Sequence, residues 1–327
     1  MQRRWLRLSG VIFLIALLIL GSVAAYERQN IYDWLALRNY QPPAAIVQLA
    51  NETTMNAYTR RVFYVNHPAL LGKSAFNQQC PDNGGENTVV LGCYHPGQKG
   101  IFLLNVTDSR LYGIEQVTAA HEVLHAVYAR LSTRERSYVN GLLMNYYQHD
   151  LHNKRVLAEI AGYQKSEPTA WVDEMNSTFG TEISQLPTPL NNYYKQFFSN
   201  RQKIVNYEMQ YQAALTSGQA QVAKDDAMLA AWKRQVATNE LSLQAQENTI
   251  SNDQAHLESL KNSGDISDFN AGVPGYNAKV DSYNTLVNST RSLISQYNQL
   301  VAKRNSIAVA ENQLVQDITA APQPISQ

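Results

Sequence analysis

The chain has 327 residues, and its 27 basic and 27 acidic side chains give a formal net charge of zero at pH 7. This balance argues against nucleic acid as a partner, because nucleic-acid-binding domains concentrate positive charge. The length suffices for two soluble modules and a short leader.

Residues 1–25 are predicted to form a transmembrane anchor or a signal peptide. Three arginines precede an uncharged stretch at residues 8–25, which is about the shortest length that spans a bilayer core. Because basic residues stay in the cytoplasm, the N-terminus is expected to be cytoplasmic and the bulk of the chain extracytoplasmic, in the periplasm or outside the cell. The small residues before Tyr26 also suit a cleavage site, which would give a secreted protein, but the long apolar run favours the anchor.

Residues 26–45 are expected to be a linker, and residues 46–189 a domain that begins with β-like sequence. The clearest strands are residues 61–65 and 100–106. Both are short, rich in aromatic or β-branched residues, and bounded by turn-forming residues.

The only two cysteines, Cys80 and Cys93, are expected to form a disulfide. An exported chain meets an oxidising compartment, where two thiols usually pair. A turn-forming segment and then a strand-like run separate them, so the bond would close a hairpin or loop and stabilise the fold by about 3 kcal/mol. Metal binding by these cysteines is disfavoured because the CxxC spacing is absent.

The sequence pattern becomes helical after Asp108. Ser132 and Glu135 have the spacing of a capping box at the start of the second helix, and Pro168 suits the first turn of the fourth. Four helices are predicted, over residues 112–131, 133–148, 150–164 and from 168 to at least 179.

Residues 190–320 are predicted to form a long antiparallel coiled-coil hairpin. Apolar residues recur at every seventh position from Val222 to Leu257, which is the repeat of a coiled coil. A second heptad series follows, and two arms of equal length favour a hairpin over separate rods. Because many seam positions are polar, we expect an adaptable coiled coil that self-associates or binds a partner protein. The turn near residues 263–275 is assigned to Gly264, Asp265, Gly272, Pro274 and Gly275.

The chemistry is predicted to reside in an HExxH sequence, His121-Glu122-Val123-Leu124-His125. On a helix, residues i and i+4 point the same way, so both imidazoles can bind one metal ion. Glu122 projects beside them, where it can act as the general base. The residues on both sides of the motif are uncharged, which favours a helix packed beneath a site over a surface helix that carries these residues by accident.

The stretch from Thr118 to Val127 resembles the zincin metallopeptidases. The resemblance implies a Zn²⁺-dependent hydrolase of the α+β class, in which a small β-sheet precedes a helical bundle that carries HExxH, over about residues 45–190. It also implies that the strand at 100–106 pairs along its edge with an extended peptide. The Met-turn subgroup is excluded, because the residues after His125 lack its glycine and its third histidine.

The other large zincin subgroup, the gluzincins, takes its third zinc ligand from a glutamate of a later helix. Residues 171–182 resemble the glutamate-bearing helix of the thermolysin-like gluzincins, with a spacing that differs by one residue. The resemblance implies Glu174 as the third ligand, with Glu182 as the runner-up and Glu159 and Glu167 as further candidates. Water in the fourth position would make the site open and catalytic.

The leading hypothesis is a membrane-tethered, extracytoplasmic zinc metallopeptidase that acts on peptide or protein substrates. Tyr146, His149 and Tyr163 are candidates for stabilising its oxyanion. One alternative is an envelope scaffold or adaptor built on the coiled coil, with an inactive or structural metal domain; a base at Glu122 favours the enzyme. A further alternative is a hydrolase of peptidoglycan peptides, which would use the same chemistry.

Overall fold

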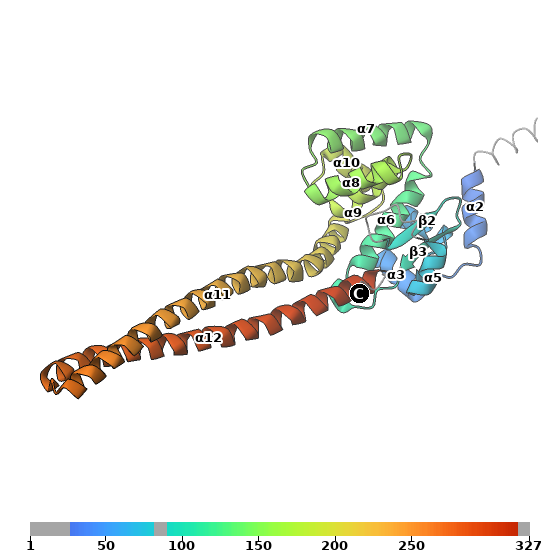
Figure 1. The fold of residues 1–327 in the computed structure, drawn as a ribbon. Coiled ribbons are helices and arrows are strands. Elements are labelled where there is room, and N and C mark those ends of the chain that lie inside the picture. The colour runs from blue at the N-terminus through green and yellow to red at the C-terminus, as the bar shows by residue number, and fades with distance from the viewer. Residues whose placement is uncertain (1–26, 82–89, 320–327) are drawn as a thin grey trace, which may run out of the picture. The chain divides into compact units, whose positions relative to one another are not determined.

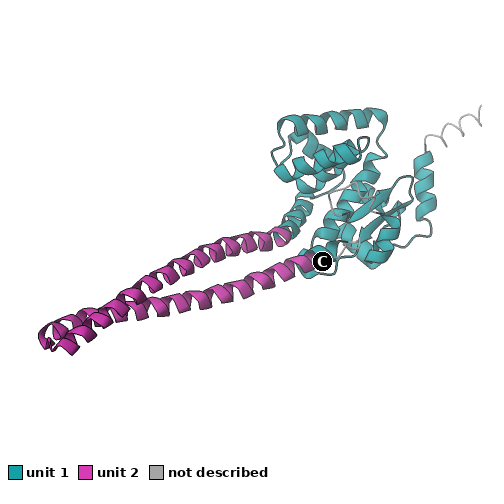
Figure 2. Cartoon of the chain, viewed as in Figure 1, with its two compact units in different colours: residues 1–213, 315–327 teal, residues 214–314 magenta. Residues whose placement is uncertain are grey.

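The computed structural model describes residues 27–81 and 90–319 (Figure 1). In these residues the chain is a mostly helical α+β protein with a small mixed sheet and a long helical hairpin. It divides into two compact units, which Figure 2 colours separately. Unit 1 consists of residues 1–213 and 315–327, and unit 2 of residues 214–314. Unit 1 is therefore assembled from two separate parts of the sequence.

Unit 1 contains the sheet and most of the helices. The long helix α11 (Arg201–Ser263) begins in unit 1 and continues into unit 2, and α12 (Ile266–Ile318) ends in unit 1. The remaining helices of unit 1 are α2 (Arg28–Leu37), α3 (Ala44–Glu52), α4 (Ala57–Val65), α5 (Lys73–Gln79), the 3-10 helix η1 (Ser109–Leu111), α6 (Ile114–Tyr128), α7 (Thr133–His149), α8 (Lys154–Ser166), α9 (Trp171–Glu182) and α10 (Thr188–Tyr194).

The sheet has the strand order β1-β3-β2. Strand β1 (Ala69–Leu71) is parallel to β3 (Gly100–Leu104), and β2 (Gly92–His95) is antiparallel to it. The strand predicted at residues 100–106 is thus confirmed. The prediction that its edge is free for a peptide is wrong, because β3 is the central strand and both of its edges are already paired.

The prediction of a strand at residues 61–65 is wrong, because these residues lie within helix α4. The Asn56 side chain begins this helix by accepting a hydrogen bond from the backbone N–H of Thr59 at 2.9 Å. Thr59, Val62 and Phe63 are buried, and their spacing of three and four residues is the period of a helix.

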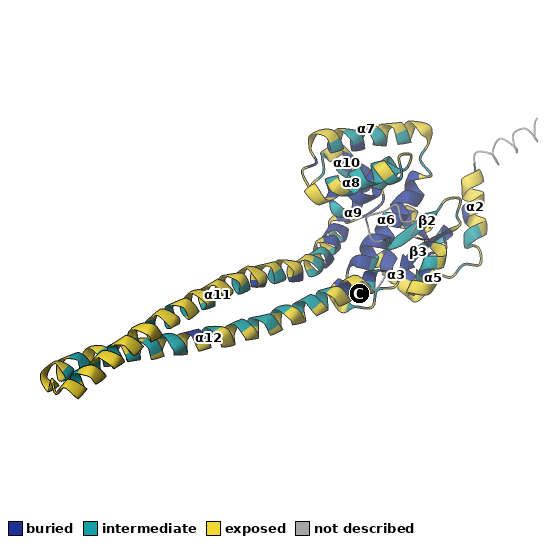
Figure 3. Cartoon of the chain, viewed as in Figure 1, coloured by how far each residue is buried: buried dark blue, intermediate teal, exposed yellow. Residues whose placement is uncertain are grey.

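Helix α6 lies at the centre of unit 1, and only Glu115 and His121 of its residues are not fully buried (Figure 3). It begins after Gly113, where a Cβ atom would lie 2.9 Å from the backbone oxygen of Tyr207. The φ angle of 109° at Gly113 is also one that only glycine adopts without strain. The start of the HExxH helix is therefore determined by this one glycine.

The four helices predicted between residues 112 and 179 are present as α6 to α9 with shifted ends. The capping box is confirmed: the Glu135 carboxylate accepts a hydrogen bond from the Ser132 N–H at 2.8 Å, and Ser132 caps α7 in return. Helix α9 begins at Trp171, three residues after Pro168, and continues through Gly180 to Glu182. Gly180 is needed for close packing, because a Cβ there would lie 2.4 Å from Leu124 Cδ1 of α6.

The Cys80–Cys93 disulfide is confirmed, with the two Cα atoms 5.9 Å apart. It joins the end of α5 to strand β2. Cys80 is buried with Phe76 and Leu104, so the bond lies against apolar side chains of the sheet. It restrains the strand nearest to the HExxH helix.

Unit 2 is an antiparallel hairpin of α11 and α12. Cross-helix pairs lie at nearly equal distances from the turn: Asn239 donates a hydrogen bond to Thr290 at 2.9 Å, and Arg304 donates to Asp226 at 2.8 Å. The predicted apolar heptad positions from Val222 to Leu257 are all partly buried. The hairpin is thus confirmed.

The turn of the hairpin is shorter than predicted. Gly264 takes a left-handed φ of 81° after α11, and the Asp265 side chain accepts from the N–H of Asp268 at the start of α12. Gly272, Pro274 and Gly275 do not break the helix, since Pro274 lies inside α12. Because Pro274 has no backbone N–H, the carbonyl of Asn270 has no partner within the helix. Asn270 is exposed, so water can replace the missing hydrogen bond.

The predicted anchor or signal peptide at residues 1–25 lies outside the described residues. Within residues 27–81 and 90–319, no helix combines the length and the apolar character that crossing a bilayer requires. The linker predicted at residues 26–45 contains helix α2.

Candidate metal centre

Two elements of unit 1 supply the residues of the candidate site. Helix α6 carries His121, Glu122 and His125 in consecutive turns, and the two imidazole centroids are 4.9 Å apart. Helix α9 packs against α6 and carries Glu174 in its first turn. The structure thus brings the two predicted histidines together with the favoured glutamate.

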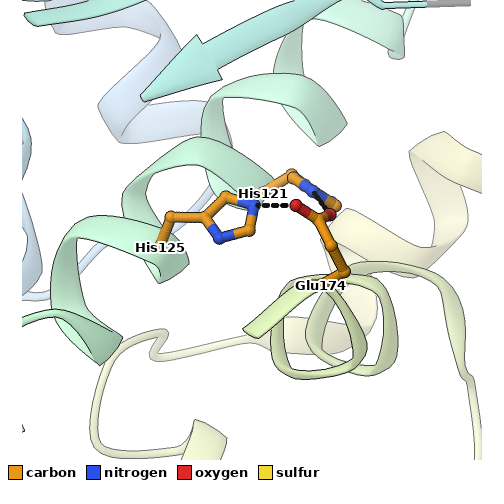
Figure 4. Close-up of side chains that lie close together, drawn as sticks. All are labelled: His121, His125 and Glu174. Atoms are coloured by element: carbon orange, nitrogen blue, oxygen red, sulfur yellow. Dashed lines mark ion pairs between the residues drawn. The ribbon is translucent and has the colours of Figure 1, made fainter. Parts of the chain in front are cut away.

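The Glu174 carboxylate faces both imidazoles (Figure 4). One oxygen lies 3.4 Å from Nε2 of His121, and the other lies 3.6 Å from Nε2 of His125. One donor atom from each of the three residues can be chosen so that all lie within 4.8 Å of one another. The group therefore converges on one point.

The donor atoms fit a zinc ion. Two ligands of tetrahedral zinc, each about 2.1 Å from the metal, lie about 3.4 Å apart, which is close to the observed nitrogen–oxygen distances. Two imidazole nitrogens and one carboxylate oxygen also form a donor set that zinc prefers. Among the described residues the group offers three ligands, which leaves a fourth coordination position for water or substrate.

Asp173 contacts His125 from the side opposite Glu174. Its Oδ1 atom lies 3.0 Å from Nδ1 of His125. With Nδ1 directed to Asp173, Nε2 is the nitrogen left to face Glu174. A carboxylate behind a histidine ligand fixes the tautomer and the orientation of the ring. The sequence prediction missed this role of Asp173.

Glu122 is buried beside the triad, with 5% of its surface exposed. Strand β2 passes directly over it: a Cβ atom at Gly92 would lie 2.8 Å from Oε1 of Glu122 and 2.5 Å from Cγ2 of Thr118. Only glycine leaves room for the carboxylate there. The sequence prediction did not identify Gly92, because the contact joins residues far apart in the sequence.

The charges of the site shift the pKa values of its members. Burial acts to lower the pKa of His125, but the negative charges of Glu174 and Asp173 outweigh it and raise this pKa to about 10. At His121, burial acts in the same direction, and contact with Glu174 raises the pKa overall. Burial raises the pKa of the Glu122 carboxyl. Groups with such shifts concentrate at functional sites.

The other candidate glutamates lie elsewhere. Arg155 of α8 donates to Glu182 at 2.6 Å, to Glu208 at 2.7 Å and to Glu159 at 3.1 Å. Glu182 also lines a cavity of about 690 Å³ that the triad does not line. Glu167 is the residue that ends α8. The runner-up ligand is therefore engaged in an ion pair, and only Glu174 joins the histidines.

Two candidates for oxyanion stabilisation are directed elsewhere. The hydroxyl of Tyr146 donates to the backbone oxygen of Gln185 at 3.4 Å. His149 is exposed at the end of α7 and contacts the backbone oxygen of Asn145. Tyr163 lies on α8 and is partly buried.

Comparisons of the chain with family models, with curated protein sequences and with solved structures find no match. A function for this chain is therefore inferred from the geometry of the site.

Proposed function

We propose that this protein is a zinc-dependent metallopeptidase that hydrolyses peptide bonds outside the cytoplasm and is tethered to a membrane by residues 1–25. The observation that carries the proposal is the convergence of His121, His125 and Glu174 with the buried carboxylate of Glu122 beside them. The Cys80–Cys93 disulfide supports an oxidising compartment.

An open coordination position favours catalysis over a structural role. Structural zinc sites usually have four protein ligands, whereas the group described here has three. A structural site also has no use for an acid–base group, yet Glu122 is held beside the ligands at the cost of burying a carboxylate. These two features favour the peptidase over the scaffold.

The residues of the chain have distinct roles in this reaction. Zinc held by the triad would polarise the scissile carbonyl and activate a water molecule. Glu122 accepts the proton of the attacking water and then delivers it to the leaving nitrogen. Asp173 orients the His125 ring.

Strand β2 is the element along which a substrate chain fits best. Gly92 brings this strand against Glu122, and among the described strands only β3 pairs with β2. An extended peptide that hydrogen-bonds to the other edge of β2 would pass close to the general base. Specificity would then arise from side-chain pockets next to β2.

Zinc content and hydrolysis of an unfolded, dye-labelled protein test the proposal on detergent-solubilised full-length chain. Glu122→Gln is expected to keep zinc and to reduce the rate by about 10²- to 10⁴-fold, because the base is lost while the ligands remain. Glu174→Ala is expected to lose zinc as well as activity.

Glu182→Gln is the matched control, since Glu182 lies on the same helix as Glu174 but pairs with Arg155. It is expected to keep both zinc and activity. If Glu174→Ala binds zinc as well as the parent, the ligand assignment is wrong. If the zinc-loaded parent hydrolyses no peptide bond, the scaffold alternative replaces the peptidase.

A further inference from the structure

Helix α2 packs against the rest of unit 1 through its polar side. Its one buried residue is Asp33, with 2% of its surface exposed. The Asp33 carboxylate accepts two hydrogen bonds from Arg130, each at 2.9 Å, and one from Gln98 at 2.7 Å. Arg61 of α4 lies 3.3 Å away. This buried, fully paired aspartate fixes the rotation of α2 about its own axis.

Most of α2 is exposed (Figure 3), and its exposed residues include four large apolar side chains. Trp34 is 62% exposed and Tyr32 is 52% exposed, followed by Leu35 at 46% and Ile31 at 43%. Ile31, Trp34 and Leu35 have the spacing of a single helix face, and Tyr32 lies at its edge. A helix that packs on a protein core normally buries its apolar side chains and exposes its charged ones. In α2, Asp33 is buried and the large apolar side chains are exposed.

Exposed basic residues border this apolar face. Arg28 and Arg38 lie at the two ends of α2, and both are exposed. Tryptophan and tyrosine favour the boundary between lipid and water, and arginine reaches from there to lipid phosphates. A helix with this distribution lies in the plane of a membrane surface.

The sequence before α2 indicates the same occupant. The uncharged residues 8–25 end just before α2 begins at Arg28. This uncharged stretch has about the shortest length in residues that can span a bilayer core. The chain would therefore leave the bilayer where α2 starts.

We propose that α2 lies in the interface of a lipid bilayer, with Ile31, Tyr32, Trp34 and Leu35 inserted at the level of the headgroups. Asp33 then connects this membrane helix to the rest of unit 1. Its partner Arg130 lies two residues after the end of α6, the HExxH helix. The contact thus gives the candidate site a fixed orientation relative to the membrane surface.

Tryptophan quenching by lipids with brominated acyl chains tests the proposal on the full-length chain in vesicles of phosphatidylcholine with a minority of phosphatidylglycerol. Replacing Trp5, Trp171 and Trp232 by Phe leaves Trp34 as the only tryptophan. We expect bromines near the headgroup end of the chains to reduce its emission by roughly half. The matched variant that keeps only Trp171, on α9 of unit 1, should be quenched far less.

A second variant separates insertion from folding. Ile31→Asp combined with Leu35→Asp should remove most of the Trp34 quenching and leave the zinc content unchanged, because neither residue contacts the site. Absence of Trp34 quenching in the variant that keeps only Trp34 overturns the proposal. Dimerisation of the chain in detergent that Trp34→Glu abolishes would overturn it too, since a second copy would then cover this face.

Discussion

Asp173 and Glu174 are neighbours in the sequence but contact His125 through different ring nitrogens. A histidine ligand held on both sides has little freedom to rotate, so the energy for ordering it is supplied by the fold before a metal binds. Preorganisation of this kind raises metal affinity without adding a ligand.

Replacing Asp173 should therefore weaken metal binding. Asp173→Ala is expected to reduce zinc affinity by about 10- to 100-fold, and Asp173→Asn by less, because an amide oxygen can still lie against Nδ1. Competition with a chromophoric chelator measures this effect. Asp281→Ala, at an exposed position of α12, is the control and should bind zinc as the parent does. Equal affinities for Asp173→Ala and the parent would refute the role.

The residues of the site were predictable where they depend on spacing along one helix. His121, Glu122 and His125 were predicted from the HExxH motif, and Glu174 was predicted from a resemblance to the gluzincins. Asp173 and Gly92 were not predictable, because their roles arise from contacts between α6 and α9 or β2 that no local pattern encodes.

The packing of α9 against α6 depends on one residue without a side chain. Gly180 lies where a Cβ would meet Leu124 at 2.4 Å and Tyr194 at 2.7 Å. The same contact positions Glu174, which lies on α9 between Asp173 and the buried Met175.

Gly180→Ala is expected to lower the free energy of unfolding by about 1–3 kcal/mol, although alanine favours helices, because the extra methyl group overpacks the contact. Gly162→Ala in α8 is the matched control, since no atom lies within 4 Å of its Cβ position. That variant should gain about 0.5–1 kcal/mol from helix propensity alone. Urea unfolding distinguishes the two, and a stabilised Gly180→Ala would contradict the packing argument.

Three glutamates and one arginine join α8, α9 and the start of α11. This group has two more negative than positive charges when all members are ionised. Burial and then the Glu182 charge raise the pKa of Glu208 to about 7 from an ordinary value of 4.5, with Arg155 opposing them. Between pH 4.5 and 7, Glu208 is therefore protonated in the folded chain and ionised in the unfolded chain. The contribution of Glu208 to the stability of the fold consequently falls as the pH rises from 4.5 to 7.

Glu208→Gln should remove this dependence. At pH 8 the variant is expected to be more stable than the parent by about 1 kcal/mol, while at pH 5 the two should be nearly equal, because Glu208 is then protonated in the parent. Urea unfolding at both pH values measures the difference. Glu240→Gln, at an exposed position of α11, should show no pH-dependent gain.

Elements with a long, regular period were predictable, namely α6 to α9 and the hairpin. The short N-terminal elements were not. Residues 61–65 read as a strand because their aromatic and β-branched composition dominates a five-residue window, while the helical spacing appears only when Thr59 is included. The central position of β3 depends on β1, a three-residue strand too short for a sequence signal.

At the scale of the whole molecule, unit 1 includes residues from both sides of the hairpin. The end of α12 belongs to unit 1, where Ile318 is 6% exposed and Lys73 of α5 donates a hydrogen bond to the backbone oxygen of Gln316. Residues far apart in the sequence therefore stabilise the unit that carries the candidate site.

A charged side chain in place of Ile318 should destabilise unit 1. Ile318→Asp is expected to reduce the free energy of unfolding by about 2–4 kcal/mol, since it buries a carboxylate without a partner. Val309→Asp changes a residue of the same helix that is 69% exposed, and its effect should stay within about 0.5 kcal/mol. Thermal unfolding of each variant measures its change in stability, and the zinc content of each variant is a second readout. Equal effects of the two substitutions would show that Ile318 does not support unit 1.

The return of α12 into unit 1 also orders events in time. A ribosome makes the chain from its first residue to its last, and a chain that is exported emerges in the same order. Unit 1 lacks its last packed residues until the hairpin and Ile318 have been synthesised. The candidate metal site would therefore lie on a complete unit 1 only after the whole hairpin, residues 214–314, has left the ribosome.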